Sequence, residues 1–139
     1  MRLFDMDEFI RWLKQARHTL SSAERDMFAG DYAWSCFKSQ QSAEFALKAL
    51  VRGAGRFAGG HSTLKLYEVL RDTGFEIPEH LPKWCRDLDR HYIPPRYPDA
   101  YPAGSPFEYY DRDTAEQALI FAERVVRYAE EVAASAESD

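Results

Sequence analysis

The chain has 139 residues, of which 45% are hydrophobic, 29% charged and 14% aromatic, and its formal net charge at pH 7 is −5. Such a chain is expected to form one globular domain around a single core, without a disulfide or a metal ion. The acidic balance argues against a general nucleic-acid coat protein, which would be strongly basic, but leaves room for a local basic cleft.

The sequence contains no apolar run that predicts a signal peptide or a membrane span, because its first residues, MRLFDMDEFIRW, are already charged and amphipathic. We therefore expect a cytoplasmic protein without membrane contact. The two cysteines, Cys36 and Cys85, are far apart and are expected to be buried as small hydrophobic residues.

The first half of the chain predicts two long antiparallel helices. Over residues 5–29, apolar residues recur at alternating spacings of four and three, which is typical of a helix that faces a core. Gly30 ends this pattern, and Asp31 is expected to cap a second helix over residues 32–52. Since the connection is short, the two helices are expected to lie antiparallel.

Three more helices are predicted after a glycine-rich turn. The first covers residues 63–71 with Ser62 as its cap. The next begins near Pro82, because proline suits a first helical turn, and reaches about Tyr92. The last covers residues 113–134, with an apolar face and a charged face.

The predicted fold class is therefore all-α, an up-and-down helical bundle of three long and two short helices within a single domain, residues 1–139. Residues 135–139 are expected to fray as a tail. No alternating pattern predicts a strand.

A loop rich in proline and tyrosine precedes the last helix, over residues 93–112. Its five prolines exclude a helix, and its many aromatic residues favour an ordered loop wrapped across the bundle. Arg96 lies between these prolines, where a fixed guanidinium group suits a carboxylate or phosphate ligand. The alternative is that Arg96 pairs with Glu44 or Asp99 and pins the loop.

The predicted second helix carries more polar residues than a core helix requires. Gln40 interrupts a heptad-like apolar row, and Glu44 follows one turn later. These two groups either fix the helix register, with Glu44 and Lys48 as an i,i+4 ion pair, or line a ligand or dimer cleft. Beside that row runs a mixed aromatic, amide and basic face: Trp34, Lys38, Gln41, Phe45, Lys48 and Arg52.

No cofactor or metal ion is expected. None of the four histidines is spaced at i,i+4 from another, and no carboxylate cluster completes a metal site. The sequence also has no P-loop, G-x-S-x-G or dinucleotide motif.

Four sequence blocks, in this order and spacing, resemble the HEPN family, in particular its short stand-alone prokaryotic members. They are residues 30–32 (GDY), 40–48 (QQSAEFALK), 61–62 (HS) and 92–99 (YIPPRYPD). The resemblance implies an up-and-down helical bundle that dimerises through its long helices. It also implies a partnership with a minimal nucleotidyltransferase, in pairs similar to toxin–antitoxin systems.

Many HEPN proteins are metal-independent ribonucleases whose signature is an Arg followed, after four to six positions, by a His near the start of the last helix. Here no His follows Arg112. The signature is absent from its family position, so no catalytic residue is assigned and the chain is expected to lack this activity.

We therefore predict a non-catalytic module that binds a nucleotide, RNA or a partner nucleotidyltransferase. One alternative is a ribonuclease that uses His91 with Arg96, or His61 with Arg56. Another is a homodimeric assembly domain without a small ligand. The candidate binding residues lie on the second helix and in the loop: Lys38, Gln41, Glu44, Lys48, Arg52, Tyr92, Arg96 and Tyr97.

Overall fold

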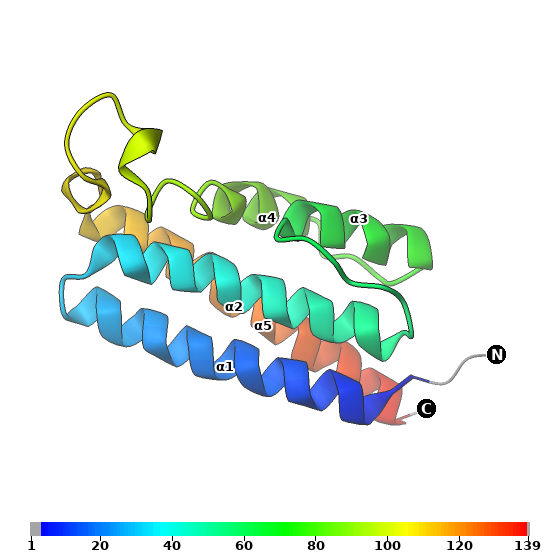
Figure 1. Ribbon diagram of the computed structural model, residues 1–139. Coiled ribbons are helices and arrows are strands. Elements are labelled where there is room, and N and C mark those ends of the chain that lie inside the picture. Colours follow the sequence, from blue (N-terminus) through cyan, green and yellow to red (C-terminus); the bar gives the residue numbers. More distant parts are fainter. Residues whose placement is uncertain (1–3, 139) are drawn as a thin grey trace.

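The computed structural model describes residues 4–138 and confirms the all-α prediction, since this part of the chain contains five α-helices and no strand. Two short 3-10 helices, η1 and η2, interrupt the loop before the last helix (Figure 1). The elements are α1 (Met6–Phe28), α2 (Tyr32–Gly53), α3 (Thr63–Thr73), α4 (Leu81–Asp89), η1 (Pro98–Ala100), η2 (Pro106–Tyr109) and α5 (Arg112–Ser138).

Helix α2 lies at the centre, between α1 and α5 on one side and the α3–α4 pair on the other (Figure 1). Small residues allow a close approach between α1 and α2. The hydroxyl groups of Ser35 and Ser42, both fully buried, donate to the carbonyl oxygens of Ala23 and Ala16 on α1. These two buried hydroxyl groups are therefore satisfied internally, as burial requires. Ser39, also fully buried on α2, is an exception, because its hydroxyl oxygen has no hydrogen-bond partner among the described residues.

The observed helix ends differ from the predicted ones in three places. Asp31 precedes α2, but its side chain makes no capping hydrogen bond. Helix α4 ends at Asp89, before Tyr92, and α5 continues to Ser138 where a frayed tail was expected. The Ser62 cap is confirmed, because its side chain accepts a hydrogen bond from the backbone N–H of Lys65.

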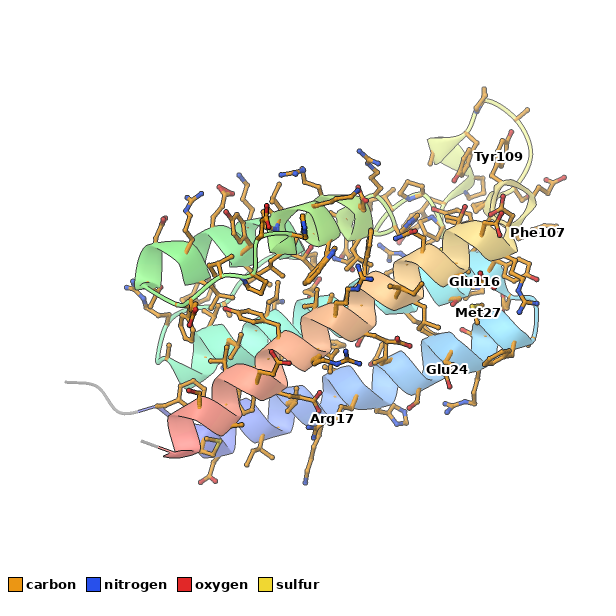
Figure 2. The ribbon with its side chains drawn as sticks, turned by 180° about the vertical axis from the view of Figure 1, so that it is seen from behind. Arg17, Glu24, Met27, Phe107, Tyr109 and Glu116 are labelled. Atoms are coloured by element: carbon orange, nitrogen blue, oxygen red, sulfur yellow. The ribbon has the colours of Figure 1, made fainter. Side chains whose placement is uncertain are left out.

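The loop before α5 lies at one end of the bundle, so the prediction that it wraps across the helices and covers its aromatic residues was wrong (Figure 1). Tyr97, Phe107 and Tyr109 are 48%, 71% and 49% exposed. Figure 2 shows Phe107 and Tyr109 beside the first turns of α5. The loop is held by contacts of its own, among them stacked rings of Tyr101 and Tyr109 with centroids 4.1 Å apart, and by the contact of Arg96 with Phe37 of α2.

Both cysteines are free and buried, as predicted. In the part of the chain that the structure describes, no helix is long and apolar enough to cross a membrane. The same residues contain no group of three or more His, Cys, Asp or Glu side chains that could hold a metal ion.

Candidate functional site

Asp89, the last residue of α4, joins three helices. Its carboxylate accepts hydrogen bonds from the backbone N–H groups of Thr63 and Leu64, at 2.9 and 3.1 Å, and so occupies the N-terminus of α3. The hydroxyl groups of Ser62 and Thr63 donate to it at 2.8 and 2.7 Å. Gln40 of α2 adds a fifth bond at 3.3 Å.

A buried polar chain runs along α2 beside this junction. Gln40 is fully buried and donates to the carbonyl oxygen of His61 at 2.8 Å, while Gln41 donates to Gln40 and to Glu44. Glu44 is 2% exposed and forms the predicted i,i+4 ion pair with Lys48, at 3.0 Å. The structure therefore supports the interpretation that these groups hold helices in register.

The buried chain reaches the surface at His61. Its Nδ1 atom lies 3.4 Å from a carboxylate oxygen of Glu44, and its side chain is 59% exposed. The imidazole ring stacks on Tyr92, with centroids 4.9 Å apart and planes inclined by 14°. A buried carboxylate thus orients an exposed imidazole.

Arg96 lies against a group of aromatic rings. Its guanidinium carbon is 4.2, 4.5 and 4.9 Å from the ring centroids of Phe37, Tyr92 and Tyr97. Its Nε donates to the carbonyl oxygen of Tyr92 at 2.8 Å. No carboxylate of the described residues pairs with it, so the expected ion pair with Glu44 or Asp99 was wrong. Aromatic faces compensate the cation here instead.

His61, Asp89 and Tyr92 line a cleft of about 590 Å³, which is within the usual size of ligand sites. Arg96 is not part of this lining but lies beside it, against the Tyr92 ring. Arg90 adds a second cation at the edge of the cleft, with a side chain that is 76% exposed. The residues that line the cleft are His61, Ser62, Asp89, Arg90, Tyr92, Ile93 and Pro94.

The structure brings six of the eight predicted site residues into one connected group and places the other two elsewhere. Gln41, Glu44 and Lys48 connect through His61 to Tyr92, and from there to Arg96 and Tyr97. Lys38 instead pairs with Asp26 of α1 at 2.7 Å, and Arg52 pairs with Glu8 of α1 at 2.8 Å. Both lie in the α1–α2 groove and do not face the cleft.

Asp89 was not predicted as a site residue, and His61 was named only in the alternative ribonuclease pair with Arg56. Their roles depend on contacts with residues 17 to 49 positions away, which no helical spacing indicates. The signal for His61 as a binding residue was that His61 and Ser62 form one of the blocks that resemble the HEPN family.

The two ribonuclease pairs considered from the sequence are not assembled. Arg56 donates to Thr73 at the far end of α3 from His61. The Nδ1 of His91 contacts the Tyr110 hydroxyl at 3.1 Å, away from the rings around Arg96.

Burial lowers the pKa of His91 from 6.5 to about 4, so the folded protein holds this ring neutral. Since the unfolded chain binds the proton more readily, stability present above pH 6.5 is expected to be lost as the pH falls toward 4. We expect a loss of about 2 kcal/mol, measured by urea unfolding across that range. His91→Gln should flatten this dependence, whereas an unchanged slope would contradict the assignment. Substitution of the exposed His80 by Gln is the control.

A family model described as "HEPN domain" matches residues 10–132. A protein of Methanocaldococcus jannaschii named "Putative toxin MJ1304" is 29% identical over 123 residues, which cover 83% of this chain and 81% of that protein.

Two crystal structures are similar over nearly the whole chain. TT1696 from Thermus thermophilus is 46% identical with a TM-score of 0.85, covering 88% of this chain and 96% of the other. ST0689, described as an archaeal HEPN homologue, is 32% identical with a TM-score of 0.74, covering 94% and 98%. The family match and these relatives agree with the observed bundle, and the chain belongs to the HEPN domain family.

Proposed function

We propose that this HEPN protein is a binding module of a toxin–antitoxin-like pair and that its cleft binds a nucleotide. The likeness to a relative named as a toxin supports the toxin-like role. The observation that carries nucleotide binding is the Arg96 guanidinium, which is held by three aromatic rings and has no acidic partner among the described residues.

A phosphate is the ligand that suits this guanidinium group. Arg has five N–H donors, and the contacts within residues 4–138 use only Nε and, at 3.4 Å, Nη1. Nη2 therefore remains available for a charge-assisted hydrogen bond. The exposed ring of His61 and the half-exposed ring of Tyr97 offer faces on which a base can stack.

Calorimetric titration with ATP, GTP and the dinucleotide ApA tests this proposal. We expect binding that Arg96→Gln weakens about tenfold or more, because a charge-assisted contact is lost. Arg112→Gln is the matched control, since Arg112 is exposed and already paired with Glu116 at 2.7 Å. The absence of heat with all three ligands would overturn the nucleotide proposal.

The same titration bears on the other predicted partners. If Arg96→Gln left nucleotide heats unchanged but reduced the molar mass measured by light scattering, the assembly role would replace the proposal. A complex with a coexpressed minimal nucleotidyltransferase, lost in Arg96→Gln, would assign the cleft to a protein partner.

Metal-free ribonuclease activity is a second candidate, and the Glu44–His61 contact favours it. A carboxylate that orients an imidazole is the arrangement of a general base, and Arg90 lies in the same cleft to stabilise a charged phosphorane. Cleavage of total RNA in EDTA that disappears in His61→Gln but persists in His91→Gln would support this activity. An RNA pool left intact by the native protein would reject it.

A further inference from the structure

A second cavity, of about 520 Å³, lies between the segment after α3 and the last turns of α5. It is near the end of the bundle where α1 begins and α5 ends, whereas the residues of the candidate cleft lie toward the middle and the other end (Figure 1). The lining residues are Phe75, Glu76, Ile77, Pro78, Tyr128, Glu131, Val132 and Ser135.

The lining combines apolar side chains with two carboxylates that lack a cationic partner within residues 4–138. Phe75, Ile77 and Val132 are half-buried and form much of the apolar wall. Glu76 and Glu131 are both exposed, and neither forms an ion pair within 4 Å in the part of the chain that the structure describes. Arg127 is one turn before Glu131 on α5 but does not pair with it.

The side-chain hydrogen-bonding groups of this cavity mostly accept hydrogen bonds. Tyr128 is 6% exposed, and its hydroxyl group donates its single proton to the carbonyl oxygen of Glu76 at 2.9 Å. The Tyr128 hydroxyl oxygen can therefore only accept a hydrogen bond from a molecule bound in the cavity. Burial raises the pKa of Tyr128 to about 12, and the charge of Glu76 adds to this, so the hydroxyl stays protonated. Of the lining side chains, only the Ser135 hydroxyl retains a proton to donate.

From this cavity we infer a docking site for a partner protein segment that presents an Arg or Lys side chain between apolar neighbours. The two carboxylates and the Tyr128 oxygen complement a cationic donor, and an anion would meet two like charges. The half-buried side chains of Phe75, Ile77 and Val132 beside the carboxylates favour a segment with apolar residues on both sides of the basic one. This site does not depend on the proposed function of the cleft.

Titration of the ¹⁵N-labelled full chain with the peptide acetyl-Leu-Arg-Leu-amide tests the inference. We expect amide shifts confined to residues 75–78 and 128–135, with a dissociation constant of about 1 mM that rises with added salt. The charge-reversed peptide acetyl-Leu-Glu-Leu-amide should bind at least about tenfold more weakly.

The double variant Glu76→Gln/Glu131→Gln removes both charges at nearly constant volume and should weaken the arginine peptide about tenfold. Glu24→Gln is the matched control, because Glu24 is an exposed glutamate on α1 without an ion pair in the described residues (Figure 2).

No shifts with the arginine peptide, or equal binding of both peptides, would overturn the inference. It would also fail if phenethylammonium shifted these amides while the peptide did not, because the site would then take a free organic cation. Equal affinity of the double variant and Glu24→Gln would reject the role of the carboxylates.

Discussion

Replacing Asp89 by alanine is expected to lower the free energy of unfolding by about 4 kcal/mol. The substitution removes five hydrogen bonds at once and leaves the Gln40 amide and the first N–H groups of α3 without their acceptor. Urea unfolding followed by circular dichroism measures the change.

Asp87→Ala is the matched control for Asp89, since it also removes a carboxylate from α4. Asp87 contacts Lys83 and Arg90 at the surface, and exposed pairs contribute at most about 1 kcal/mol. Asp89→Asn should lie between the two, because its amide oxygen still accepts while its NH₂ group faces donors. Similar losses for the Asp87 and Asp89 variants would refute the special role of Asp89.

Breaking the Glu44–Lys48 ion pair is also expected to lower the free energy of unfolding strongly. Glu44→Leu leaves the ammonium group of Lys48, which is 9% exposed, without its carboxylate, and is expected to cost about 4 kcal/mol. Lys48→Met is expected to cost less, because Glu44 keeps its contacts with Gln41 and His61.

The double variant Glu44→Leu/Lys48→Met should be more stable than Glu44→Leu alone, because it leaves no unpaired buried cation. The coupling energy from urea unfolding of the four proteins measures this, and a value near zero would show that the two groups act independently.

The helical periodicity predicted the long helices well because their apolar faces are continuous and Gly30 and the proline-rich segment separate them. The prediction of helix ends and caps failed where tertiary contacts determine them. α4 stops three residues before the predicted end, and its last residue, Asp89, binds the start of α3, a contact that no helical pattern indicates. Asp31 has no capping bond, although its residue type favours one.

The site was predicted in part for the same reason. The polar residues of α2 were visible in the sequence, but only the packing of the helices decides which of these residues face α1 and which face the cleft. Lys38 and Arg52 were assigned to the site, yet Asp26 and Glu8 hold them in the α1–α2 groove. The alternative that Arg96 pairs with Glu44 or Asp99 was wrong, and Arg96 lies against aromatic rings instead. One of these rings, Phe37, comes from α2, and no local pattern indicates its approach.

The Asp89 junction also determines how the native bundle opens. The amide hydrogens of Thr63 and Leu64 are held by a residue at the C-terminal end of α4, so fraying of that end releases the first turn of α3 as well. The α3–α4 hairpin is therefore expected to exchange its amide hydrogens as one cooperative unit, while α1, α2 and α5 remain folded. Opening of the cleft and local unfolding of the α3–α4 hairpin are then expected to have the same free energy.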